Sequence, residues 1–194
     1  FVMDALMKGG IPFHMKDAIP NLFAHWISLD IIAYLRLVSG TGNTRANWLR
    51  IMNRPNRYIK REALAPFTSD ISVAQLKAYY QDKDWMLERL DRLEYDLSIM
   101  KRMSPYAAIH YLSNAMKYQD YLKDYAKEHH INEQELLDVL NAVHESSQSC
   151  RTFAEWFTYI DTYTEELQKQ AKSPASNDAN NESGVCLCTL HCAK

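Results

Sequence analysis

The residues whose types and spacing most directly suggest chemistry lie between positions 31 and 61. This stretch contains seven basic residues and no acid, whereas the rest of the chain carries 15 basic and 24 acidic residues. Guanidinium groups bind phosphate oxygens through paired hydrogen bonds, and clustered cations release counterions when they meet nucleic acid. The stretch therefore predicts phosphate or DNA binding, unless several of its arginines pair with acids from other helices. Besides Arg36, the basic residues are Arg45, Arg50, Arg54, Arg57, Lys60 and Arg61.

Two large aromatic residues, Trp48 and Tyr58, are interleaved with these cations. Aromatic rings can stack on nucleic-acid bases, but they contribute more often to a hydrophobic core. We expect both rings to belong to the core.

A second reactive group combines Cys186, Cys188 and Cys192 with His191. Cysteine and histidine are the usual ligands of zinc, so a metal-binding tail is one interpretation. Cys186 and Cys188 also have the spacing of a buried strand, in which thiols act as small apolar groups. We favour reduced structural cysteines of a cytosolic protein and expect no metal site.

Helices must position most of these side chains. The chain has only five glycines and six prolines, and its long stretches rich in Leu, Ala, Glu, Lys, Gln and Met favour helix. We expect helices over residues 20–38, from about residue 43 to before Pro55, and over residues 60–65. Thr152 and Glu155 have the spacing of a capping box. Further helix starts are expected near Ser72, Asp84, Ser104, Tyr118, Asn132 and Thr152.

The two ends of the chain show a different pattern. A short helix over residues 2–8, a strand over residues 11–15 and a second strand from Val185 are expected. Residues 173–184 hold no large apolar side chain and predict a flexible linker. We therefore predict a mainly α protein, with a helical domain at residues 20–172 inserted between α/β segments at residues 1–19 and 185–194.

Length and composition set the broad class of the protein. A chain of 194 residues with 47% hydrophobic residues can bury a sizeable core. It has neither an apolar run of about eighteen residues nor the pattern of a signal peptide, so a cytoplasmic protein without a membrane partner is expected. Because residues 2–8 read as the middle of a helix without a cap, we expect the chain to start inside a larger protein.

The segment Thr189-Leu190-His191-Cys192-Ala193-Lys194 is similar to the Thr-x-His-x-Ala-Lys stretch that begins the fifth motif of UvrD-like DNA helicases. Residues 11–13 resemble the strand after the fourth motif of this family, and residues 30–37 the helix that opens its inserted 2B subdomain. Residues 53–59 are similar to the family's Asn-x-Pro-x-Arg-x-Ile segment. The family often has Gly-Ile-Gly where this chain has Tyr58-Ile59-Lys60, and tyrosine adopts the turn made by such a glycine less readily.

The resemblance to UvrD, PcrA and Rep implies a fragment of an ATP-dependent 3′-to-5′ DNA helicase or translocase. The chain would be a multi-helix 2B-type insertion flanked by remnants of the RecA-like motor domain 2A, and it would stop within the fifth motif. By resemblance, Thr189 and His191 would contact the DNA backbone and Lys194 would support the turn. The parent protein would bind ATP, Mg²⁺, and DNA with single-stranded and duplex parts.

The sequence holds no phosphate-cradling Gly-x-x-x-x-Gly-Lys-Ser/Thr motif, no acidic metal pair after a strand and no identifiable arginine finger. We therefore expect no catalytic residue and no cofactor in the chain itself, which should not hydrolyse ATP. A helical protein–protein interaction module, whose basic stretch meets an acidic protein or the chain's own acidic helices, is the alternative.

Overall fold

The computed structural model describes residues 5–6, 9–11, 13–15, 20–42, 44–172 and 185–187. Helices make up most of this part, which confirms the prediction of a mainly α protein. The chain forms two compact units. One is Leu22–Phe157, and the other combines Phe1–Asn21 with Thr158–Lys194.

Helix α2 (Trp26–Ser39) is the centre of the Leu22–Phe157 unit and contacts α3, α5, α6 and α8. Most of its residues are buried, as expected for a helix that is apolar on nearly all sides. Gly40 ends it in the left-handed conformation, with φ of 71°, and donates its N–H to the carbonyls of Arg36 and Leu37. At its other end, the helix begins later than the predicted range of residues 20–38, because a short 3-10 turn at Leu22–Ala24 (η1) precedes it.

The basic stretch continues into helix α3 (Thr44–Ile51), a loop, and a second 3-10 turn, η2 (Arg61–Leu64). Trp48 is buried and donates its indole N–H to the carbonyl of Ile71 at 3.0 Å, so the prediction of a core position is confirmed for Trp48. The predicted short helix at residues 60–65 is thus a 3-10 turn.

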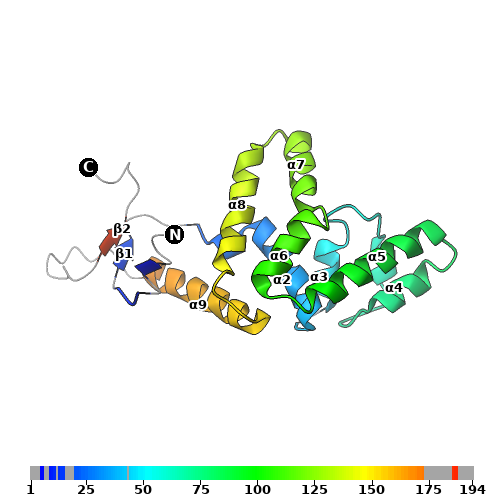
Figure 1. The fold of residues 1–194 in the computed structure, drawn as a ribbon, viewed down its shortest axis with the longest axis horizontal. Coiled ribbons are helices and arrows are strands. Elements are labelled where there is room, and N and C mark those ends of the chain that lie inside the picture. The colour runs from blue at the N-terminus through cyan, green and yellow to red at the C-terminus, as the bar shows by residue number, and fades with distance from the viewer. Residues whose placement is uncertain are drawn as a thin grey trace. The chain divides into compact units, whose positions relative to one another are not determined.

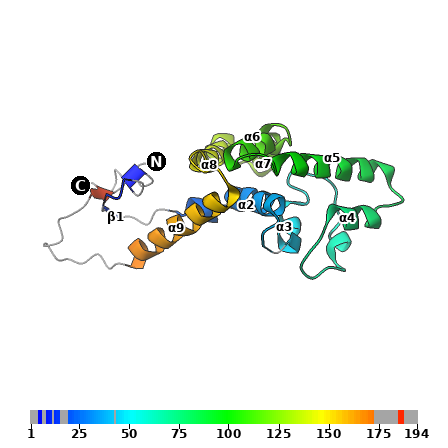
Figure 2. The same ribbon diagram turned by 60° about the horizontal axis from the view of Figure 1, so that its bottom comes forward.

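The remaining helices pack as neighbours along the chain. α4 (Val73–Tyr79) lies beside α5 (Asp84–Met100), and α7 (Tyr118–His129) lies beside α8 (Glu133–Ser146), as Figure 1 shows. Within this unit, α5, α6 (Pro105–Asn114), α7 and α8 line one side, whereas α2 and α3 lie on the other (Figure 2). The unit is therefore built from two layers of helices, which bury their apolar faces against each other.

Helix α9 (Phe153–Lys172) and the other later helices begin within one residue of their predicted starts, and side-chain caps at Ser72, Ser104 and Asn132 define three of these starts. The amide of Glu155 donates to Thr152 Oγ1 at 3.2 Å, as in a capping box. The Glu155 carboxylate accepts from the N–H of Arg151 at 2.7 Å and also interacts with the backbone of Thr152, as the motif predicts. A complete capping box is present at Ser72 and Gln75.

The two short strands come from opposite ends of the chain. β1 (Phe13–Met15) pairs in parallel with β2 (Val185–Leu187), with Phe13 opposite Val185. Both strands were predicted, and the structure adds their pairing. The predicted linker at residues 173–184 and most of the predicted helix at residues 2–8 lie outside the described residues.

The core of the helical unit leads to a first prediction. Ile31 is completely buried on α2, so Ile31→Ala removes apolar contacts and leaves a cavity. We expect the free energy of unfolding in denaturant to fall by about 2–5 kcal/mol. Ile131→Ala is the matched control, because Ile131 is 40% exposed. Equal losses in the two variants would contradict the central position of α2.

Candidate nucleic-acid interface

A buried carboxylate, Asp30 on α2, organises the basic stretch. Its side chain is completely inaccessible to solvent. Arg54 Nη1 donates to both Asp30 oxygens, at 2.9 and 3.1 Å, and Tyr118 donates its hydroxyl to Oδ2 at 3.0 Å. Arg50 Nε lies 2.9 Å from Oδ1, but its N–H is not aligned with that oxygen, so the contact is an ion pair without a hydrogen bond. Asp30 therefore holds two of the predicted phosphate-binding arginines.

Burial affects the ionisable groups of this cluster. Burial raises the pKa of Asp30 above its ordinary value, although the Arg54 guanidinium and the hydrogen bond from Tyr118 oppose the rise. Burial, followed by the proximity of Asp30, raises the pKa of Tyr118 well above that of a free phenol. The Tyr118 hydroxyl thus keeps its proton and remains a donor to Asp30. The two arginines supply positive charge that a buried carboxylate requires.

The same cluster anchors the loop after α3. Tyr34 donates its hydroxyl to the carbonyl of Arg54 at 2.7 Å, and the Arg54 guanidinium lies over the Trp26 ring at 5.6 Å. Arg57 donates Nη1 to two backbone carbonyls, at 3.1 and 3.2 Å, and lies over the Tyr34 ring. These contacts of Arg57 stabilise the loop. The phosphate contact predicted for Arg57 stays a prediction.

Arg50 and Arg54 remain partly accessible despite their pairing. Their side chains are 32% and 39% exposed and line a cavity of about 520 Å³ beside α3 and α7. Arg54 Nη2 and Nε have no hydrogen bond within the described residues, so they can donate to an anion that enters the cavity. The rest of the cavity is lined by Ala46, Leu49, Met52, Asn53 and Tyr121.

A neighbouring cavity of about 560 Å³ has the opposite charge character. Asn53, Pro55 and Asn56 form one wall, and α7 contributes carboxylates to the other. Phosphates would meet repulsion there, so this cavity is unfavourable for an anion. The acidic residues are Asp120, Asp124 and Glu128, accompanied by Lys117.

The other basic residues differ in how they are used. Arg45 donates Nε to the carbonyl of Leu64 at 3.3 Å, which fixes α3 to η2. The Arg36 guanidinium lies 5.8 Å from the centre of the Phe157 ring. Lys60 and Arg61 are exposed, and their side chains make no hydrogen bond or ion pair within the described part of the chain. Lys60 and Arg61 are therefore the cations most available to an external phosphate.

Sequence reasoning missed a cluster of exposed rings. Tyr58, predicted to be core, is 59% exposed, so that prediction is wrong. Its φ of 60° places it in the left-handed region, so the backbone adopts a turn that glycine would favour. The Arg89 guanidinium of α5 lies 5.0 Å from the centre of the Tyr58 ring and 5.2 Å from the centre of the Trp85 ring. The four-residue spacing of Trp85 and Arg89 was the only signal available in the sequence.

The C-terminal residues of the predicted site, Thr189, His191 and Lys194, lie outside the described residues, and their DNA contacts stay predictions. The side chains of the cysteine and histidine group at positions 186–192 are likewise outside the description. Among the side chains that the structure does describe, no three His, Cys, Asp or Glu residues are placed to share a metal ion. No helix in the described ranges has the length and apolarity needed to cross a membrane.

Comparison with known proteins gives no match to any protein-family model or to any curated protein.

The Asp30 cluster leads to a second prediction. Asp30→Ala leaves two arginines and the buried Tyr118 hydroxyl without their shared partner, so the free energy of unfolding should fall by about 3 kcal/mol. Asp120→Ala, which removes a 59% exposed carboxylate 3.5 Å from Lys117, should have little effect. Chemical denaturation of both variants measures the difference. A loss for Asp30→Ala no larger than that for Asp120→Ala would show that the cluster does not anchor the loop.

Proposed function

We propose that this chain is the helical, DNA-facing subdomain of an ATP-dependent 3′-to-5′ DNA helicase or translocase similar to UvrD, PcrA and Rep. In this proposal, a parent protein supplies the ATP and Mg²⁺ site and hydrolyses ATP. The subdomain binds the DNA backbone or regulates access to it. Residues 1–19 and 185–194 belong to the motor domain, with residues 20–172 as the helical subdomain and residues 173–184 as a linker.

The observation that supports the insertion is the parallel pairing of β1 with β2. Parallel strands cannot be joined by a tight turn and need a long crossover connection, which here contains the whole helical unit. Helical units inserted in this way leave the two strands free to share one sheet of a larger α/β domain. The order of the helicase-like segments in the sequence agrees with this arrangement.

The contact with DNA is proposed for the exposed cations at the start of η2. Lys60 and Arg61 are adjacent and have no acidic partner within the described residues. Arg50 and Arg54 add partly exposed guanidinium groups nearby in sequence, although Asp30 takes much of their charge. A sequence-independent contact fits these residues, because lysine and arginine contacts to phosphates carry no information on the base sequence.

This surface leads to a third prediction. We expect Lys60→Gln combined with Arg61→Gln to weaken binding of a duplex with a single-stranded 3′ tail, because two phosphate contacts are lost. The slope of log affinity against log salt should become shallower by about 2, since each contact with duplex contributes about 0.9. Fluorescence anisotropy of labelled DNA at a series of salt concentrations measures both quantities.

A matched control is available at the end of α5. Lys101 and Arg102 are an adjacent, exposed lysine–arginine pair, so Lys101→Gln with Arg102→Gln removes the same charge at another place. This control should leave the affinity and the salt slope much closer to those of the unchanged protein. Equal effects of the two double variants, or no effect of either, would contradict the proposed surface. Absence of all DNA binding would favour the alternative, a helical protein–protein interaction module.

A further inference from the structure

The exposed cluster of Tyr58, Trp85 and Arg89 has the composition of a base-stacking site. The Arg89 guanidinium carbon lies 5.0 Å from the centre of the Tyr58 ring and 5.2 Å from that of Trp85. Tyr58 is 59% exposed and Trp85 is 51% exposed, so much of each ring remains open to solvent. A cation between two exposed rings joins two features that single-strand binding proteins use, aromatic platforms and positive charge.

The Tyr58 ring is held in place by its loop. Asn53 Oδ1 accepts the N–H of Ile59 at 2.9 Å, and Asn53 Nδ2 donates to the carbonyl of Ile59 at the same distance. Asn56 Oδ1 accepts the N–H of Tyr58 at 3.1 Å. These bonds fix the left-handed conformation of Tyr58, which is unfavourable for a residue with a large side chain. Strained positions of this kind persist where the surrounding structure determines them, and they occur preferentially at functional sites.

Cations lie beside the Tyr58 ring. The backbone N–H of Lys60 donates to the Tyr80 hydroxyl at 2.6 Å, and Lys83 Nζ lies 6.0 Å from the centre of the Tyr80 ring. Tyr80 therefore connects two lysines, one on the Tyr58 loop and one immediately before α5. Both lysine side chains are exposed, so phosphates that flank a stacked base would meet positive charge.

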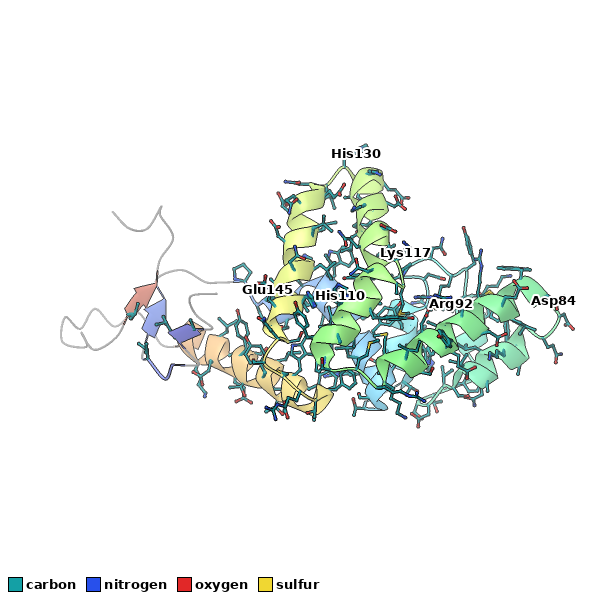
Figure 3. The ribbon with its side chains drawn as sticks, viewed as in Figure 1. Asp84, Arg92, His110, Lys117, His130 and Glu145 are labelled. Carbon is teal, nitrogen blue, oxygen red and sulfur yellow. The ribbon has the colours of Figure 1, made fainter. Side chains whose placement is uncertain are left out.

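The helical period of α5 brings further charged residues to the side of the helix that carries Trp85. Trp85, Arg89 and Arg92 recur at spacings of four and three residues and so lie along one face. Glu88, three residues after Trp85, lies at the edge of this face, and Arg92 pairs with Asp96 at 3.3 Å. Figure 3 places Asp84 at the N-terminal end of α5 and Arg92 farther along it. Among these residues Arg89 is the cation without an ion pair in the described part of the chain, so the positive charge beside Trp85 comes from Arg89 together with Lys60 and Lys83.

We propose that Tyr58 and Trp85, with Arg89 between them, bind unpaired bases of single-stranded nucleic acid by stacking. In a duplex the faces of the bases are covered by their neighbours, so only unpaired or terminal bases can use such rings. This inference rests on the proposed function in that both assign a nucleic-acid ligand. The inference differs from the proposed function in the part of the ligand that is bound. Lys60 and Arg61 bind phosphates, whereas Tyr58 and Trp85 bind bases.

The experiment uses two strands of equal length and charge, a mixed-sequence DNA oligonucleotide and one whose central positions are abasic. The whole chain should bind the strand with bases on the order of tenfold more tightly, since one stacked base contributes about that factor. Tyr58→Leu with Trp85→Leu should bind the two strands equally, at the affinity of the abasic strand. Circular dichroism and thermal unfolding establish that the variant is folded.

A control variant tests whether any exposed ring would serve. Tyr95 is 56% exposed on α5 beside Arg92, at 5.9 Å, but has no second ring facing that arginine within the described residues. Tyr95→Leu should retain the preference for the strand with bases. A tryptophan fluorescence titration gives an independent readout, because stacking on Trp85 should quench emission in the unchanged protein and in Tyr95→Leu, but much less in Trp85→Leu.

The outcomes separate this inference from the proposed function. If the unchanged protein binds both strands equally while Lys60→Gln with Arg61→Gln still weakens binding, base stacking is wrong and phosphate binding stands. If neither strand binds, both proposals fail. If neither strand binds and the chain instead binds a protein through Tyr58 and Trp85, the cluster is a protein interface and the stacking proposal is overturned.

Discussion

The burial of one carboxylate constrains much of the helical unit. Asp30 lies on the central helix α2 with no access to solvent, so its charge has to be balanced by groups that reach into the core. Arg50 from the end of α3 and Arg54 from the following loop supply the charge, and Tyr118 at the start of α7 supplies a hydroxyl donor. These contacts fix α3, the loop and α7 to one point on α2. The arginine-rich stretch is thus first of all a structural element.

The sequence predicts the local features well and the long-range ones poorly. Several of the later helices start at caps such as Ser104 and Asn132, whose hydrogen bonds lie within three residues of the cap. The partner of Tyr118 lies 88 residues away, and no local pattern shows that Asp30 faces it. Asp30 also stands one position before the acid-free stretch, so a count of charges places the balancing acid outside it. The pairing of β1 with β2 depends on the fold in the same way.

The residues of the candidate site also divide into those that the sequence predicts and those that depend on the fold. Lys60 and Arg61 could be identified from charge alone, and their exposure agrees with a role in binding. Trp85 and Arg89 could not, because any two residues four apart on a helix are neighbours, so the spacing alone does not indicate a site. Only the left-handed turn at Tyr58 brings a second ring against Arg89. The sequence favours a core position for Tyr58 because large aromatic residues are often buried. It does not show that Asn53 and Asn56 hold the Tyr58 loop at the surface.

The loop between α3 and η2 links the buried cluster to the exposed one. Arg54, at its beginning, is bound to Asp30 and lies over Trp26, while Tyr58 and Lys60, at its end, face solvent. Asn53 closes the loop through three hydrogen bonds to Arg57 and Ile59. A ligand that binds at Tyr58 and Lys60 therefore meets a surface whose backbone is already ordered, and it loses less free energy to ordering the loop than it would at a flexible one. In the proposed complex, the arginines that do not reach the ligand would contribute to binding through the rigidity of the loop they anchor.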